Sequence, residues 1–220
     1  MMSPLVVLDL DGTLVDSVPD LAAALNRLMS ARQIAPFSHP DVAAMVGDGA
    51  AALVGRAFAR RNVAQDPQAL GAFLADYGAH VAVASHPYPG VVATLAAMAA
   101  RGWTLAVCTN KPVDAARRLL ETLGLARFFA AIGGGDSFPT RKPDPAHLLA
   151  TIAAAGGVAG RAVMVGDHHN DILAARGAGM PCIFAAWGYG PASAGDEAAA
   201  VATGFADVPH LADAMFRAAP

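Results

Sequence analysis

Residues 4–13 of the chain read PLVVLDLDGT, an aliphatic run followed by two aspartates, a glycine and a threonine. Such a run, bounded by a turn signal, favours a strand that is buried on both faces. Because side chains alternate along a strand, Asp9 and Asp11 point to the same side. Two carboxylates there repel each other unless a cation or a shared proton lies between them. The pattern predicts an ionic site at the strand end, although Asp11-Gly12 is also a common turn dipeptide.

The composition limits the kinds of partner that the chain can have. Its 220 residues suffice for one full core and a smaller appendage, and its formal net charge is −3. The basic residues form no stripe, so we do not expect nucleic-acid binding. No apolar run approaches about 18 residues and the N-terminus lacks a secretory pattern, so we expect no membrane span. Cys108 and Cys182 fall in apolar runs, which predicts buried free thiols in a cytoplasmic protein.

Two patterns divide the chain. Residues 18–85 show helical periodicity, with helices expected near 21–28, 42–46, 51–59 and 70–83, before two prolines and a glycine in 86–90 interrupt it. Beyond residue 90, helices (91–100, 113–123, 145–155, 171–178) alternate with strands (104–109, 129–132, 162–165, 182–185). The alternation predicts an α/β core with a parallel sheet and helices on both faces. We therefore expect a core from residues 1–15 and 87–220, with a helical insert at 16–86.

Polar residues follow the other predicted strands as well. Thr109 and Asn110 come after the second strand, where a turn into a helix favours an anion, although either residue could instead cap that helix. Lys142 lies in a loop that two prolines stiffen, and it is one of only two lysines. Asp167 stands at a further strand end, with Asp171 four residues on. Ligands bind beyond the carboxyl ends of parallel strands, so we expect these residues to converge.

Carboxylates, a hydroxyl and a lysine at one sheet edge suit phosphoryl transfer with a hard cation. Mg²⁺ prefers oxygen ligands and commonly bridges to a substrate phosphate, and it would hold Asp9 and Asp167 together. One carboxylate can then attack phosphorus, while another protonates the leaving oxygen and later deprotonates the attacking water. The lysine and the threonine would stabilise charge on the equatorial oxygens.

These motifs, in this order and at this spacing, resemble the four motifs of the haloacid dehalogenase-like hydrolases, whose core is a Rossmann-like parallel sheet. The resemblance covers essentially the whole chain and implies a Mg²⁺-dependent phosphatase that works through an aspartyl-phosphate. By that similarity, Asp9 is the nucleophile and Asp11 is the general acid and base. Thr109 binds phosphate with help from the Asn110 amide, and Lys142 steadies both nucleophile and phosphate.

The resemblance also implies the metal ligands. Asp9, Asp167 and the main-chain carbonyl of Asp11 would ligate Mg²⁺, while Asp171 would orient Lys142 or a metal-bound water. Adjacent histidines at 168 and 169 depart from the pattern of many relatives. Consecutive helical residues do not share a face, so we expect one of them at the rim of the site rather than a two-histidine chelate.

The helical insert resembles the small four-helix cap of the phosphoglycolate phosphatase-like branch of this family. Its segment 46–49 reads VGDG, and Arg56 follows, where a planar guanidinium could meet a substrate carboxylate or simply face solvent. The expected partner is thus a small phosphorylated metabolite, with 2-phosphoglycolate as the leading substrate and a monomer or homodimer as the assembly. Residues 187–190 read WGYG and are interpreted as an ordinary turn, rather than as the glycine loop that some phosphatases place near the site.

Other reactions of the same superfamily are separated by residue type. Asp11 argues against a dehalogenase, and the absence of lysine before Lys111 leaves a phosphonoacetaldehyde hydrolase without its Schiff-base residue. A β-phosphoglucomutase-like transferase, a pyrophosphatase and a nucleotidase stay open, because they use the same two aspartates. A non-catalytic binding module is disfavoured, since no motif residue is missing.

Overall fold

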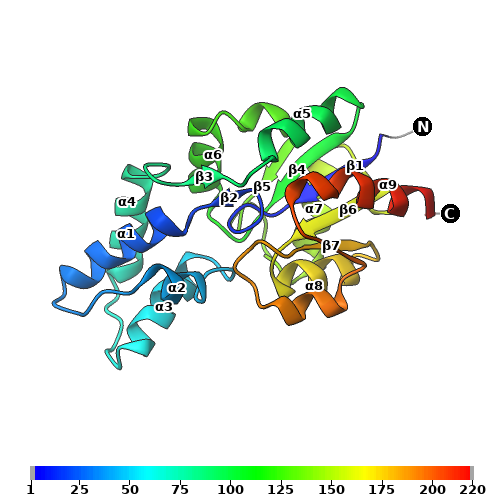
Figure 1. Ribbon diagram of the computed structural model, residues 1–220. Coiled ribbons are helices and arrows are strands. Elements are labelled where there is room, and N and C mark those ends of the chain that lie inside the picture. Colours follow the sequence, from blue (N-terminus) through cyan, green and yellow to red (C-terminus); the bar gives the residue numbers. More distant parts are fainter. Residues whose placement is uncertain (1–2, 219–220) are drawn as a thin grey trace.

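The computed structural model describes residues 3–218, in which an α/β core lies beside a cluster of helices (Figure 1). The sheet of the core has six strands in the order β5-β4-β1-β6-β7-β8, and every neighbouring pair is parallel. The strands are β1 (Leu5–Leu8), β4 (Thr104–Cys108), β5 (Ala131–Gly133), β6 (Ala162–Gly166), β7 (Cys182–Ala185) and β8 (Ala200–Ala202). The predicted parallel α/β fold is confirmed.

Strand β1 is buried on both faces, as its aliphatic sequence predicts. Leu5 and Val7 pack on one side against α7 (Pro145–Ala154) and α8 (His169–Gly177). Val6 and Leu8 pack on the other side against α5 (Val91–Ala100), α6 (Val113–Thr122) and α9 (Val208–Ala218). The alternation of side chains along the strand thus supplies two apolar layers. Both cysteines are buried and free, as expected.

The register of the central strands brings three strand ends to one place. Leu8 of β1 pairs with Val107 of β4 and with Val165 of β6. The next residues along these strands therefore emerge together, and the Asp9 amide donates a hydrogen bond of 2.9 Å to the Val165 carbonyl. This edge is the carboxyl edge of the sheet, where a parallel fold leaves room for a ligand.

The helical cluster has an apolar core of its own. It contains α1 (Val18–Ser30), α2 (His39–Ala43), α3 (Ala50–Arg60) and α4 (Ala69–Ala79). Side chains such as Leu25, Met29, Val54, Phe58 and Phe73 are buried within it. The chain enters and leaves the cluster through β2 (Val15–Asp16) and β3 (His86–Pro87), which pair antiparallel. The two connections consequently lie side by side (Figure 1).

The structure differs from the predicted elements at several boundaries. The helix predicted at 42–46 begins at His39 and ends at Ala43; residues 44–45 form a turn, and Gly47 and Gly49 then adopt positive φ. The helix predicted at 70–83 ends at Ala79. The segment at 86–87 contains a proline and pairs with β2, so it does more than interrupt a helix. Proline is tolerated in this short pairing because its nitrogen, which cannot donate, is not needed for a hydrogen bond between the strands. Strand β8 and helix α9 were not predicted.

A helix that spans a bilayer must be about 20 residues long and predominantly apolar. Among the helices of residues 3–218, none is long and apolar enough to cross a membrane.

Candidate active site

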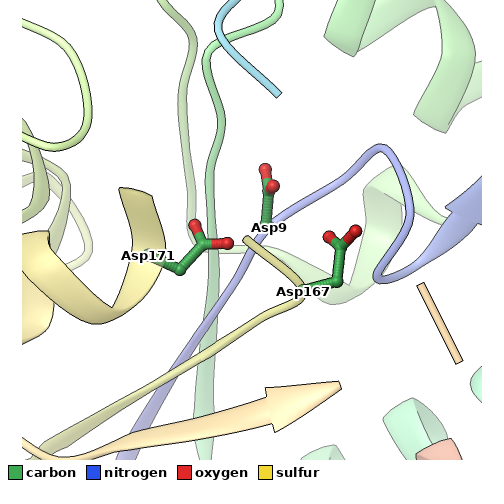
Figure 2. Close-up of side chains that lie close together, drawn as sticks. All are labelled: Asp9, Asp167 and Asp171. Atoms are coloured by element: carbon green, nitrogen blue, oxygen red, sulfur yellow. The ribbon is translucent and has the colours of Figure 1, made fainter. Parts of the chain in front are cut away.

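Three aspartates converge at the carboxyl edge of the sheet (Figure 2). Asp9 follows β1, Asp167 follows β6, and Asp171 lies in the first turn of α8. One carboxylate oxygen of each lies within 4.8 Å of the others, and all three residues are buried. Three buried carboxylates so close together are strongly unfavourable without positive charge nearby.

Lys142 supplies part of that charge. Its ammonium lies 2.9 Å from Asp9 Oδ1 and 2.6 Å from Asp171 Oδ1, and the residue is 2% exposed. The loop that carries it is held from both sides: its amide donates to His147 Nδ1 at 3.2 Å, and its carbonyl accepts from Asn110 Nδ2 at 3.0 Å. The buried backbone contacts fix this cation in place, as the proline-rich loop sequence suggested.

The charge of the cluster is still unbalanced, since only the Lys142 ammonium and the ring of His168, which lies 3.0 Å from Asp167 Oδ2, face three carboxyl groups. Burial raises the pKa of Asp9 to about 7; Lys142 opposes this shift, while Asp171 and Asp167 add to it. A divalent cation beside Asp9 and Asp167 would offset both the burial and the repulsion. The donors are hard carboxylate oxygens of the kind that Mg²⁺ and similar ions prefer. The cluster therefore fits a metal ion.

Asp167 is held by groups that sequence reasoning did not connect with it. Its Oδ1 accepts a hydrogen bond from the Thr13 hydroxyl at 2.9 Å. Its Oδ2 accepts from the amides of Tyr189 at 2.8 Å and of Gly190 at 3.3 Å. A Cβ at Gly188 would overlap the side chain of Asp167. The segment 187–190 is therefore part of the site and not an ordinary turn, and its two glycines are the only signal for this in the sequence.

Asp11 lines the same cavity as Asp9, but its side chain has different partners. Its carboxylate accepts from the Ser17 hydroxyl at 2.5 Å, and the Lys111 ammonium lies 3.0 Å from Oδ1. The side chain is thus directed away from the three-aspartate cluster, toward the entrance of the helical segment. The metal contact predicted for Asp11 uses its main-chain carbonyl and stays a prediction. Lys111 and Ser17 were not predicted as site residues.

Thr109 and Asn110 do not cap the helix that follows them. The N-cap of α6 is Pro112, and the Val113 amide instead donates to Asp136 Oδ1 at 2.7 Å. Thr109 is 2% exposed and lies at the end of β4, beside the cavity that Asp9 lines. Its hydroxyl accepts a hydrogen bond from the Lys111 amide at 3.2 Å, and its contact with a phosphate stays a prediction.

A loop of the helical cluster rests on this edge of the core. The Gly47 carbonyl accepts from Asn110 Nδ2 at 3.0 Å, and Asp48 Oδ1 accepts from Asn170 Nδ2 at 2.6 Å. Gly47 has φ 118°, and a Cβ there would overlap the ring of His168. The glycine therefore permits both the turn and the close approach to the core.

The two adjacent histidines lie in different environments. His168 is packed against Gly47, and its Nδ1 lies 3.0 Å from Asp167 Oδ2, so it borders the site. Its pKa is raised to about 9: burial opposes the charged ring, and Asp167 and Asp171 outweigh that effect. His169 is half exposed and faces Glu197 at 3.7 Å. The two rings therefore do not converge, in agreement with the helical geometry of consecutive residues.

A cavity lies between the helical cluster and the core. Its polar wall contains Asp9, Asp11, Thr109, Asn110 and Lys111, and its apolar wall comes mainly from Leu21, Leu53, Phe73, Leu74 and Tyr77. Arg56 lies elsewhere. It pairs with Asp48, donates to the Met45 carbonyl at 2.9 Å and lines a second cleft with His168 and Tyr189. The structure does not bring Arg56 to the cavity that contains Asp9.

Comparisons with known proteins agree with this arrangement. A sequence model of haloacid dehalogenase-like hydrolases matches residues 4–179. The chain is 48% identical over 193 residues to a phosphoglycolate phosphatase of Agrobacterium fabrum, covering 86% of this chain and 82% of that protein. It is 43% identical over 188 residues to one of Caulobacter vibrioides, covering 84% and 79%. A crystal structure of a predicted phosphoglycolate phosphatase from Haemophilus somnus superposes with a TM-score of 0.86 at 31% identity, covering 95% of this chain and 97% of the other.

Proposed function

The chain belongs to the haloacid dehalogenase-like hydrolases, and we propose that it is a phosphatase whose substrate is 2-phosphoglycolate. The observation that carries the chemistry is the single ammonium of Lys142 between Asp9 and Asp171, with Asp167 beside them. A buried ionic cluster at the carboxyl edge of a parallel sheet is suited to a phosphate and a cation. The substrate follows from the phosphoglycolate phosphatases that this chain resembles over more than four fifths of its length.

The metal in this proposal is Mg²⁺. The carboxylates of Asp9 and Asp167 and the main-chain carbonyl of Asp11 would hold it, with Thr13 and the amides of residues 189–190 orienting Asp167. When bound, the ion supplies positive charge for the phosphoryl oxygens. It also offsets the burial that raises the pKa of Asp9, so that the carboxylate is ionised at neutral pH.

Asp9 is the nucleophile in this scheme. A carboxylate oxygen of Asp9 forms a bond to phosphorus, and the bond between phosphorus and the bridging oxygen of the ester breaks. Asp11 donates a proton to that oxygen, so that the alcohol leaves neutral. Asp11 then accepts a proton from the water that attacks the acyl-phosphate, which restores Asp9 and releases phosphate. Asp11 lies at the cavity wall between the nucleophile and the helical cluster, where a leaving group would sit.

Phosphate binding is assigned to residues of the core. Thr109 and the main-chain amide of Asn110 would donate hydrogen bonds to the phosphoryl oxygens, and Lys142 would place its charge beside them. Asp171 holds the Lys142 ammonium at 2.6 Å, so its role is to position the lysine. Arg56 was predicted to meet the substrate; it stays a prediction that its pairing with Asp48 does not favour.

We assign the helical segment 16–86 as a cap on a core formed by residues 1–15 and 87–220. Support comes from its separate apolar core and from the paired connections at β2 and β3. The contact of Gly47 with Asn110 and His168 would exclude water from the cavity during the reaction. The buried free thiols of Cys108 and Cys182 suit a reducing compartment, which supports a cytoplasmic location.

A panel of phosphorylated metabolites, assayed for phosphate release with Mg²⁺ and with EDTA, tests the proposal. We expect the highest kcat/KM for 2-phosphoglycolate, loss of turnover in EDTA and recovery when Mg²⁺ is restored. The panel includes pyrophosphate, nucleoside monophosphates and β-glucose 1-phosphate, because the corresponding enzymes use the same two aspartates. A clear preference for one of these, or no phosphate release from any ester, would overturn the proposal.

A further inference from the structure

We propose that Lys111 and the hydroxyl of Tyr77 form the subsite that recognises the carboxylate of the substrate. The inference rests on the proposed phosphatase function and names a specificity determinant that the sequence motifs do not contain. Lys111 follows the end of β4, is 5% exposed, and lines the cavity that Asp9 and Thr109 also line. Among the described residues that line this cavity, it is the one cationic side chain.

The contacts of Lys111 leave its charge available to a ligand. Its ammonium lies 3.0 and 3.3 Å from the two carboxylate oxygens of Asp11 and 4.4 Å from the centre of the Tyr77 ring. An ammonium carries three donors, and a face of an aromatic ring stabilises a cation without using a hydrogen-bond acceptor. Lys142 differs in this respect, because it already lies between two carboxylates.

Tyr77 provides an independent indication of a ligand. The residue belongs to α4 of the helical cluster, is 2% exposed and lines the same cavity. Its hydroxyl is buried, and no group within residues 3–218 accepts a hydrogen bond from it. Buried hydroxyls in folded proteins are nearly always paired, so this one lacks an acceptor that a bound anion would supply.

The position of Lys111 relative to Asp11 fits a carboxylate better than a second phosphate or a sugar. Asp11 is the proposed donor to the bridging oxygen, and in 2-phosphoglycolate the carboxyl carbon is only two bonds from that oxygen. A cation in contact with Asp11 is therefore next to where this carboxylate must lie. The side chains of Leu53, Phe73 and Leu74 belong to the apolar wall of the same cavity and offer no partners to the hydroxyl groups of a sugar. Exclusion of water by this wall also strengthens an ion pair at Lys111.

The subsite contains one residue from each part of the molecule. Lys111 comes from the core and Tyr77 from the helical cluster, so the complete subsite exists only when the two are in contact. A substrate with a carboxylate would thereby favour the arrangement in which the cavity is covered. A neutral ester of similar size would lack this contribution.

The test compares 2-phosphoglycolate with 2-hydroxyethyl phosphate, which replaces the carboxylate by a neutral group. The measured quantity is the ratio of their kcat/KM values in the wild type, Lys111→Met, Lys111→Arg and Tyr77→Phe. We expect Lys111→Met to lower this ratio about 10- to 100-fold and Tyr77→Phe about 2- to 10-fold. Lys111→Arg keeps the charge and should retain most of the ratio. Arg101→Met, which removes an exposed cation that does not line the cavity, is the control.

The ratio separates recognition from an indirect effect on Asp11. If Lys111 served only to position Asp11, both esters would lose turnover equally and the ratio would not change, which would overturn the inference. That result would leave the phosphatase proposal intact, provided that the wild type prefers 2-phosphoglycolate. A wild-type ratio near one would overturn both the inference and the proposed substrate.

A binding measurement covers the case in which turnover is too slow to compare. Calorimetry with Asp9→Asn and with Asp9→Asn/Lys111→Met, each with Mg²⁺, measures the affinity for the same two esters without hydrolysis. We expect the first variant to bind 2-phosphoglycolate more tightly than the neutral ester, and the second to lose that difference. Equal preferences in the two variants would refute a carboxylate subsite at Lys111.

Discussion

Replacing Lys142 with methionine should strongly destabilise the metal-free protein. The side chain of Lys142 is 1% exposed, and its two partners, Asp9 and Asp171, have side chains that are 9% and 0% exposed. Methionine keeps most of the apolar stem but removes the charge, so both carboxylates lose their shared cation. Breaking a buried pair in this way costs about 3–5 kcal/mol of unfolding free energy.

The loss should depend on pH because of Asp9. Its pKa is raised to about 7 even with Lys142 present, so the group is largely protonated at pH 6 and largely ionised at pH 8. Lys142 lowers this pKa, so its removal raises the pKa of Asp9 further and favours a protonated carboxyl in the variant. We therefore expect a larger loss at pH 8, where the wild type has Asp9 ionised and paired with Lys142, than at pH 6, where Asp9 is largely protonated in both proteins.

Urea unfolding in EDTA, followed by tryptophan fluorescence and by circular dichroism, measures this loss, and coincident transitions justify a two-state fit. The matched control is Arg101→Met, which breaks an exposed ion pair with Asp213 and should cost at most about 1 kcal/mol. In a double-mutant cycle with Asp171→Asn, the two losses should fall short of additivity by about 1–3 kcal/mol. A Lys142→Met cost no larger than that of the control, or strictly additive losses, would refute the reasoning.

Three further outcomes are expected. Asp9→Asn should lower kcat about 10⁴-fold. It should not lower the thermal unfolding temperature of the metal-free protein, because the neutral amide avoids burying a charge. Substantial phosphate release by this variant would contradict a nucleophilic role. Burial lowers the pKa of His147 from 6.5 to about 4. The contribution of its neutral ring to the free energy of unfolding is therefore complete above pH 6.5 and falls by about 3 kcal/mol as the pH drops toward 4. His147→Asn keeps an acceptor for the Lys142 amide and should reduce this acid sensitivity in urea titrations at pH 7.5 and 4.5, whereas an unchanged sensitivity would exclude His147 as its source. Gly188→Ala should weaken Mg²⁺ binding about 10-fold or more by displacing Asp167, while Gly204→Ala, which has open space around it, should bind Mg²⁺ like the wild type in the same calorimetric titration.

Strand β1 shows which features of the fold the local sequence pattern could predict. A short β-branched run that is apolar at every position is stable only when both faces are covered, and Leu5 to Leu8 are all buried. The parallel sheet and the convergence of its strand ends follow from that one strand and from the alternation of helices and strands after residue 90. The sequence could therefore predict that Asp9, Asp167 and Lys142 lie near one another. Asp9 and Asp167 each follow a strand, and Lys142 lies in a strand-to-helix loop.

The support of Asp167 could not be predicted in the same way. Its amide donors lie at positions 189 and 190, beyond a helix and a further strand, and no periodic pattern connects them with it. The short strands β2 and β3 were missed for a similar reason, since two residues are too few to show alternation. The pairing of Arg56 with Asp48 is also a result of packing, and no local pattern indicates it.

The two lysines show what the local sequence could predict and what depended on contacts between distant segments. The local sequence places both in strand-to-helix connections at the carboxyl edge of the sheet, Lys111 after β4 and Lys142 before α7. It did not distinguish them, because the charges that define their roles come from distant segments: Lys142 meets Asp171 across 29 positions, and Lys111 meets Asp11 across 100. Which carboxylate a buried ammonium meets depends on how helices and strands pack together, and only the folded chain brings those partners within a few ångströms.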